Sequence, residues 1–215
     1  MQRAGAMALA VAVVAAITIV LGRAVGAAAV LAIDVFIAIV LYSWVNNQGL
    51  LALRSAGAMR IHRSEHERLW NVVEGLAADL SVKVPALFVI DKGGPNALAC
   101  IARGPALAVR RSLLEEFTRT ELEAVVAHAL ARFVTSDVDR ATLGISFGPL
   151  WNKGVPRVGY ADDVRAASIT RYPPALAAAV DKAEPVGDRF APLWFVGEGR
   201  AHRPPAERAA ALRDL

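Results

Sequence analysis

The sequence contains a single cysteine, Cys100, among its 215 residues. One cysteine forms no disulfide within the chain and cannot build a cysteine-based zinc cluster, which agrees with a reducing compartment. The net charge is +4, but the basic residues are scattered among acidic ones and no nucleic-acid-binding fingerprint accompanies them. These features argue against a disulfide scaffold and against a nucleic acid as partner.

Charge is also scarce in the first quarter of the chain. Residues 4–21 carry no charged side chain, and residues 24–45 carry one, Asp34. About 20 apolar residues cross a bilayer core as a helix, so each run is long enough to cross once. We therefore predict an α+β protein in which a two-helix transmembrane hairpin over residues 1–50 precedes one domain over residues 51–215.

Arginine predicts the orientation of this hairpin. Arg54, Arg60 and Arg63 follow the second run, whereas Arg23 alone lies between the runs. Because cytoplasmic loops are rich in lysine and arginine, we expect a two-pass protein of the cell membrane with its domain in the cytoplasm and membrane lipid as a partner. Asp34 is costly inside a bilayer unless it faces a partner or a water-lined cavity, or reaches one leaflet surface.

His128, Ala129 and Arg132 stand in the frame of a zinc-binding helix. In the H-E-x-x-H arrangement two histidines one turn apart bind zinc, and the glutamate deprotonates the attacking water. Here the same frame reads His128-Ala-Leu-Ala-Arg132. The general base is replaced by a methyl group and the second ligand by a cation that binds no metal. The alternative is an ordinary amphipathic helix with one partly buried histidine and one solvated arginine.

The segment around His128 follows a helix-and-strand pattern typical of an α+β domain. Its apolar residues recur at helical spacing, and Thr120 with Glu123 forms a capping box at its start. Short runs rich in β-branched and aromatic residues, separated by glycine and proline, predict strands. We expect a helix over residues 64–80 and strands over residues 84–90, 96–102 and 105–110.

Seven short motifs follow one another along the chain, among them residues 57–60, 95–99, 121–128, 170–176 and 202–208. Their sequences and order resemble those of the HtpX-type membrane zinc endopeptidases, relatives of the CAAX prenyl proteases, in their actinobacterial form. They include Pro95-Asn-Ala-Leu-Ala99, where the family has Pro-Asn-Ala-Phe-Ala, and Thr170-Arg-Tyr-Pro-Pro-Ala-Leu176. Near the C-terminus, His202-Arg-Pro-Pro-Ala-Glu-Arg208 resembles the family's His-Pro-Pro-x-x-Glu-Arg. The resemblance implies a gluzincin-like metalloprotease domain of helices and a small sheet with an edge strand.

The resemblance also locates the other zinc-site positions. Counting back from Tyr172, the family's Glu-x-x-x-Asp motif falls on Gly159 and Asp163, so its ligand glutamate is replaced by glycine. In the family this aspartate accepts a hydrogen bond from a ligand histidine. We expect Arg132 to stand near the metal's place and to pair with Asp163, so that His128, Arg132 and Asp163 converge beside the edge strand. The alternative is that these residues have drifted and are solvated.

The family's edge strand, here Pro95, Asn96, Ala97, Leu98 and Ala99, holds substrate by adding it to the sheet, which requires no zinc. We therefore predict a catalytically degenerate homologue, not an enzyme, that needs no cofactor and binds an extended peptide or a membrane-protein partner. The competing expectation is that this edge packs against the C-terminal tail of the same chain.

Two other functions stay open. One is an active zinc endopeptidase with substitute ligands, for example His128, Asp162 and His202, which is the reading that requires zinc. The other is a structural subunit of a membrane assembly in which the hairpin and Asp34 make the contacts.

Overall fold

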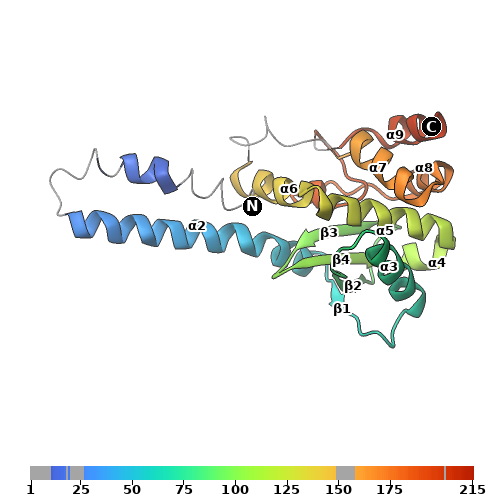
Figure 1. Cartoon of the computed structure of the whole chain (residues 1–215), viewed down its shortest axis with the longest axis horizontal. Coiled ribbons are helices and arrows are strands. Elements are labelled where there is room, and N and C mark those ends of the chain that lie inside the picture. Colours follow the sequence, from blue (N-terminus) through green and yellow to red (C-terminus); the bar gives the residue numbers. More distant parts are fainter. Residues whose placement is uncertain (1–10, 18, 20–26, 149–157, 201) are drawn as a thin grey trace.

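A computed structural model describes residues 11–17, 19, 27–148, 158–200 and 202–215. It is a mixed α+β fold with one long apolar helix that projects from a folded domain (Figure 1). The helices and strands, in chain order, are α2 (Ala27–Ser55), β1 (Met59–Arg60), α3 (Glu67–Asp79), β2 (Ala86–Ile90), β3 (Ala97–Ile101), β4 (Pro105–Arg110), α4 (Arg111–Glu116), α5 (Arg119–Val134), α6 (Asp137–Phe147), α7 (Tyr160–Thr170), α8 (Pro173–Lys182), the 3-10 turn η3 (Ala191–Leu193) and α9 (Pro205–Arg213).

The sheet has four strands in the order β1-β2-β4-β3. β2 and β4 are parallel, whereas β1 and β3 run antiparallel to their neighbours. The three longer strands lie where the sequence predicts them, because short apolar runs bounded by glycine and proline mark strands well. β3, which contains most of the Pro95–Ala99 motif, is an edge strand of this sheet.

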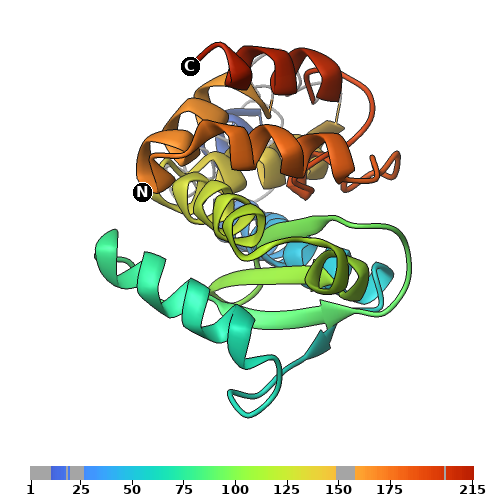
Figure 2. The same cartoon turned by 90° about the vertical axis from the view of Figure 1, so that its right-hand side faces the viewer.

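Helix α5 lies in the middle of the domain, with the sheet and α3 on one side and α7, α8 and α9 on the other (Figure 2). Its residues from Glu121 to Arg132 are buried, apart from the half-buried Glu123. The middle of the helix is therefore enclosed by the domain, whereas its two ends reach the surface at Arg119 and Val134. Its cap also differs from the predicted pair at Thr120 and Glu123, since Thr118 is the N-cap and forms the capping box with Glu121.

Helix α2 has two different parts. Its first part exposes large apolar side chains such as Leu31 and Phe36, and its last part packs against β3 and α6. Gly49 permits this contact, since a Cβ there would lie 2.1 Å from the carbonyl oxygen of Ile101. Within the described residues, one helix, Ala29–Ser55, is long and apolar enough to cross a membrane.

The predicted hairpin is not established by this structure. Most of its first span lies outside the described residues, which include 11–17 and 19 of that span. The second span continues as helix to Ser55, beyond the predicted boundary at residue 50. A gluzincin-like fold is likewise not established, whereas the α+β class and the small mixed sheet are confirmed.

Candidate functional site

The predicted zinc-site positions lie together between α5 and α7. His128 and Arg132 are one turn apart on α5 and each is 1% exposed. Gly159 is the N-cap of α7, and Asp163 follows one turn later on that helix. The Nε2 atom of His128 lies 3.5 Å from Oδ1 of Asp163. The residues converge as expected, although this separation is longer than the 2.7–3.2 Å hydrogen bond that the sequence interpretation requires.

Asp163 is paired with Arg208 of α9, not with Arg132. Nε of Arg208 donates to one carboxylate oxygen at 2.9 Å, and Nη2 donates to the other at 2.7 Å. This two-bond geometry is the strongest form of an arginine–carboxylate contact, and it removes the cost of burying either charge alone. The sequence shows Arg208 as the last residue of the His202–Arg208 motif, but it gives no distance between α7 and α9.

Arg132 instead donates to main-chain carbonyl groups near the C-terminal end of the domain. Its Nη2 lies 2.7 Å from the oxygen of Pro192, and its Nη1 lies 3.5 Å from the oxygen of Leu193. Its Nε has no hydrogen-bond partner among the residues that the structure describes. The predicted Arg132–Asp163 pair is therefore replaced by a contact between a buried guanidinium and the chain's own backbone.

The carbonyls that Arg132 binds belong to residues 191–196, which we call the covering segment. Other buried side chains hold the same segment. His202 Nε2 lies 2.7 Å from the oxygen of Ala191, and Arg208 Nη1 donates to the oxygen of Phe195 at 2.8 Å. Asn96 Nδ2 donates to the oxygen of Val196 at 2.7 Å. A cluster of buried polar groups thus fixes five carbonyls of one short segment.

The covering segment lies along the outer edge of β3. The amide of Phe195 donates to the oxygen of Ala97 at 2.7 Å, and Leu98 forms an isolated antiparallel bridge with Trp194. Pro95, Asn96, Ala97, Leu98 and Ala99 are all buried. The edge to which the sequence assigns an extended peptide is therefore occupied by the chain's own C-terminal region, as the competing expectation has it.

Phe195 also closes access to His128. The two rings meet edge to face with centroids 5.0 Å apart, and the Arg208 guanidinium stacks on the same phenyl ring at 5.2 Å. A cavity of about 10 Å³ remains between His128, Arg132, Phe195 and the strand, which is room for about one water molecule. A ligand that reaches His128 from this side has to displace Phe195.

The buried cluster has unusual proton equilibria. Burial, together with the charges of Arg208 and Arg132, lowers the pKa of His128 well below its usual range, so His128 is neutral. Burial likewise lowers the pKa of His202 to about 3. Burial raises the pKa of Asp162 to about 7, against the opposing charge of Arg132. The site therefore carries neutral imidazoles beside two fixed cations.

The family resemblance implies zinc at this place, but the donor groups present do not fit it. Catalytic zinc sites use three protein ligands, and no group of three or more His, Cys, Asp or Glu residues among those described is arranged to hold a metal. Two guanidinium groups flank His128 and oppose a further cation. Gly159 has φ of 149°, a conformation that disfavours a glutamate ligand there. The alternative ligand set of His128, Asp162 and His202 is also disfavoured, because the same two guanidinium groups would repel a metal cation there.

Asp34 lies on α2, away from this cluster. It is 8% exposed, and its Oδ1 has no hydrogen-bond partner within the part of the chain that the structure describes. Its burial agrees with an intramembrane carboxylate that faces protein, and it does not identify a partner.

Comparison with known proteins finds relatives that share a name. The chain is 35% identical over 98 residues to the Protease HtpX homolog of Tropheryma whipplei (strain Twist), covering 44% of this chain and 33% of that protein. It is 37% identical over 95 residues to the Protease HtpX homolog of Halobacterium salinarum, again covering 44% of this chain and 33% of that protein. The homologue of Lactobacillus acidophilus is 35% identical over 91 residues, covering 41% and 30%. No family model matches the chain.

The chain thus spans about a third of the length of the curated relatives that it matches. The prediction that the chain is not an enzyme is wrong on this comparison, because the relatives are named as proteases and point to an enzyme. Ala129, Arg132 and Gly159 themselves offer no side-chain ligand for zinc. They do not establish what the remainder of the site does.

Proposed function

Because the chain is a homologue of the HtpX-type proteases, we propose that it is a membrane-anchored member of that family that binds an extended polypeptide along the outer edge of β3. The observation that carries this proposal is the main-chain hydrogen bond from Phe195 to Ala97 beside the antiparallel bridge of Leu98 with Trp194, which together show that this edge accepts main-chain pairing. Main-chain pairing depends little on side-chain identity, so another extended chain can form the same bonds.

In this proposal the covering segment and the incoming polypeptide compete for one edge. The apparent affinity for the polypeptide is then reduced by the fraction of molecules in which the edge is covered. Arg132 is central to that balance, because it contacts the segment at two carbonyls and makes no ion pair within 4 Å among the described residues. Weakening this contact raises the fraction of molecules with an open edge.

A labelled peptide tests the proposal. The probe is fluorescein-labelled Phe-Ala-Pro-Leu-Trp-Phe-Val-Gly, the sequence of residues 190–197, added to the full chain in detergent micelles. We expect Arg132→Met to bind the probe roughly tenfold more tightly than the unchanged protein, since the variant leaves its edge open more often. Fluorescence anisotropy measures the dissociation constants.

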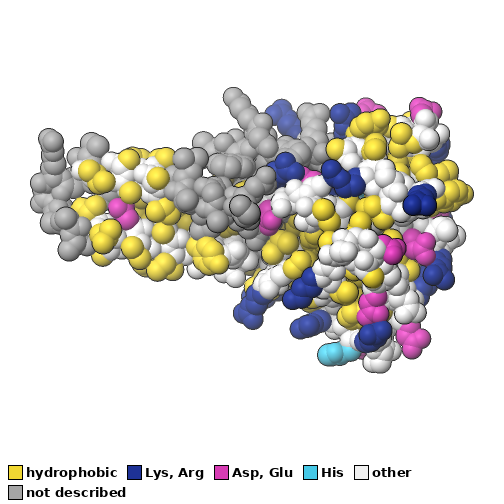
Figure 3. All heavy atoms as spheres, in the orientation of Figure 1, with side chains coloured by type: hydrophobic (Ala, Val, Ile, Leu, Met, Phe, Trp, Pro, Cys, Tyr) yellow, Lys and Arg dark blue, Asp and Glu magenta, His cyan; other side chains and the backbone are white. Residues whose placement is uncertain are grey.

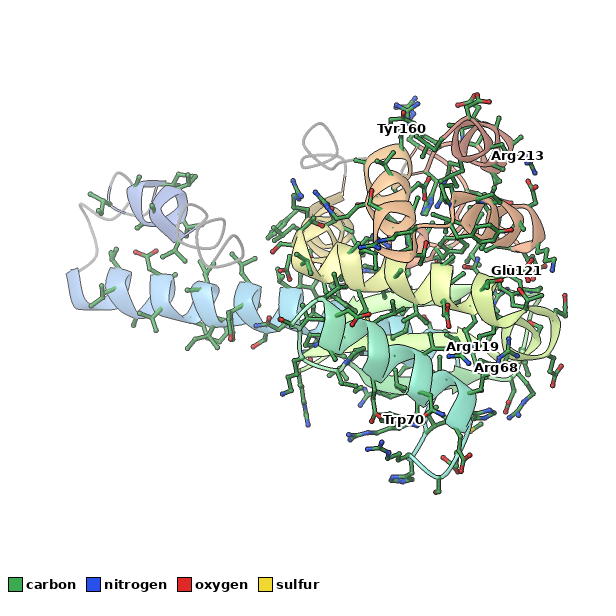
Figure 4. All side chains as sticks on the ribbon, turned by 45° about the vertical axis from the view of Figure 1, so that its right-hand side comes forward. Arg68, Trp70, Arg119, Glu121, Tyr160 and Arg213 are labelled. Carbon is green, nitrogen blue, oxygen red and sulfur yellow. The ribbon has the colours of Figure 1, made fainter. Side chains whose placement is uncertain are left out.

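The matched control is Arg119→Met. Arg119 lies on the same helix, at the end of the domain far from α2, and pairs with Glu123 at the surface (Figure 4). This variant removes the same charge from α5 without touching the covering segment, so its affinity for the probe should equal that of the unchanged protein. Equal binding by both variants, or tight binding of a probe N-methylated at the residue matching Phe195, would contradict pairing at the β3 edge.

Peptide-bond hydrolysis is a second candidate function, favoured by the names of the relatives. Incubation of the purified chain with unfolded casein, followed by mass spectrometry of the fragments, tests it. Fragments that disappear with His128→Ala would assign cleavage to this cluster. Fragments that persist in that variant would exclude the cluster as the place of cleavage.

The anchoring part of the proposal rests on α2. Its large exposed side chains between Leu31 and Trp44 are apolar, and water does not favour such a surface on an isolated helix. Resistance of the expressed chain to extraction from membranes by alkaline carbonate supports anchoring, and its recovery in the soluble fraction would contradict it.

A further inference from the structure

A groove runs along one face of α2 where the helix meets the domain. Its wall on α2 includes Ile39, Val40, Asn47 and Arg54, and Arg103 from the turn between β3 and β4 stands opposite. The volume of the groove is about 590 Å³, enough for part of a lipid molecule. The described lining residues include no aspartate or glutamate.

The chemistry of this face changes along the helix. Ile39 and Val40 are apolar, Ser43 and Asn47 are neutral polar, and Arg54 lies in the last turn. At 1.5 Å per residue, the distance from Ile39 to Arg54 along the axis is about 22 Å. One leaflet, from the bilayer centre through its head groups, is also about 20–22 Å thick. The groove therefore matches the length and the polarity gradient of one phospholipid.

The cationic end of the groove is available to an anion. Arg54 and Arg103 are exposed, and neither forms an ion pair with an acidic side chain of the described residues. Lys and Arg side chains gather beneath the junction of the projecting helix and the domain (Figure 3). Two unpaired guanidinium groups are suited to one phosphate, because each offers several donors in a planar arrangement.

Trp44 lines the same groove, between its apolar end and its cationic end. Its indole N–H donates to the oxygen of Ser146 at 3.2 Å, so the ring is held while 45% of the residue stays exposed. A tryptophan ring of this kind offers an apolar face to an acyl chain while its N–H is satisfied by the protein. Arg54 lies ten residues farther along the helix, on the side of the folded domain.

We propose that this groove binds an anionic phospholipid, with its phosphate between Arg54 and Arg103 and an acyl chain along Ile39 and Val40. The proposal rests on the membrane anchoring proposed above. It adds a site that prefers an anionic head group over a zwitterionic one. It involves neither the β3 edge nor the buried cluster.

Native mass spectrometry of the full chain in detergent tests this site. The chain is titrated with phosphatidylglycerol or phosphatidylcholine, and the bound lipid is counted. We expect one phosphatidylglycerol to bind, and the double variant Arg54→Gln/Arg103→Gln to bind it about tenfold more weakly. The matched control Arg119→Gln/Arg171→Gln removes two exposed arginines on other elements and should leave lipid binding unchanged.

The possible outcomes distinguish a failure of the lipid-site proposal from a failure of the membrane-anchoring proposal. Equal binding of the two lipids, or equal loss in both double variants, would overturn the lipid site while leaving membrane anchoring in place. A chain that carbonate extracts from membranes would overturn both. Displacement of bound lipid by 10 mM inorganic phosphate would assign the site to free phosphate and overturn the acyl-chain contact, so we expect phosphate to leave the lipid bound.

Discussion

At the scale of single residues, Arg132 and Arg208 explain why the region around His128 is both packed and polar. Each is a fully buried cation, and each donates to the covering segment. Arg208 is neutralised by Asp163, whereas Arg132 is stabilised by carbonyl oxygens and by the nearby Asp162 and Asp137. A buried charge with well-aligned partners is tolerated, but removal of the charge leaves those partners unsatisfied.

Replacing Arg132 with methionine should lower the free energy of unfolding by about 2–3 kcal/mol. The side chains have similar length, so the loss comes from carbonyl groups left without charged donors. Urea unfolding in detergent, followed by tryptophan fluorescence, measures the change. Arg119→Met, at an exposed ion pair, should change it by less than about 0.5 kcal/mol. A cost for Arg132→Met no larger than this control would show that the contact to the segment is weak.

Asp162 predicts a specific dependence of stability on pH. Its pKa is raised to about 7 in the folded chain by burial, so it stabilises the fold while protonated and that stability is lost as the pH rises through 7. Asp162→Asn should therefore remove about 2 kcal/mol of the stability difference between pH 5 and pH 8. The exposed Asp91→Asn is the control. A variant whose pH profile matches the unchanged protein would contradict the raised pKa.

Individual pairings are the part of the site that the sequence predicts least well. The motif positions place His128, Asp163 and Arg132 close together, but several buried partners compete for one carboxylate. Arg208 forms the ion pair with Asp163 because α9 places its guanidinium where it donates two hydrogen bonds to the carboxylate. That competition depends on the packing of α7 against α9, which helical periodicity does not contain.

At the scale of elements, the covering segment protects the outer edge of β3, although its first three residues form the 3-10 turn η3 and it pairs with the strand through an isolated bridge. It contributes a backbone bond to β3, a phenyl ring against His128, and carbonyl groups to the buried cations. Edge strands are prone to pairing with other chains, and covering the edge is one way to prevent it. The sequence pattern predicts the strand, and the family resemblance implies that it lies at an edge. The competing expectation covers that edge with the C-terminal tail, but the sequence does not say which residues do so, because residues 191–196 are distant along the chain.

Phe195 provides a test of this closure. We expect Phe195→Ala to make His128 react roughly tenfold faster with diethylpyrocarbonate, since the ring that closes the cavity is removed. Peptide mapping by mass spectrometry distinguishes His128 from the other histidines. Phe88→Ala, a loss of similar volume on β2, should leave the rate unchanged. Fast labelling of His128 in the unchanged protein would show that the segment does not close the site.

At the scale of the whole molecule, one helix joins the proposed membrane part to the site-bearing domain. α2 has exposed apolar side chains in its first part, and it ends packed against β3, the strand whose outer edge the covering segment occupies. The sequence predicts the apolar run but ends it near residue 45, because packing of the last turns against β3 and α6 is a long-range contact. Most of the first predicted span lies outside the described residues, so the two-pass topology stays a prediction.

The arginine distribution predicts the side of the membrane on which the domain lies. We expect a reporter that is active in the cytoplasm to be active after Leu215 in growing cells, because Arg54, Arg60 and Arg63 follow the α2 span. The same reporter at Gly22 serves as the opposite control and should be inactive. Activity of an exported reporter after Leu215 would reverse the orientation.

The central claim is that the covering segment and an extended polypeptide compete for the outer edge of β3. Its most direct test is a reversible disulfide bond between the covering segment and β3. The bond is introduced by Leu98→Cys and Trp194→Cys in a chain that also carries Arg132→Met and Cys100→Ala. Leu98 and Trp194 form the antiparallel bridge, and such neighbours lie within disulfide distance. Binding of the labelled 190–197 peptide is measured by anisotropy before and after reduction. We predict that the peptide does not bind while the disulfide is formed and binds fully after its reduction, whereas equal peptide binding in both states would contradict the claim.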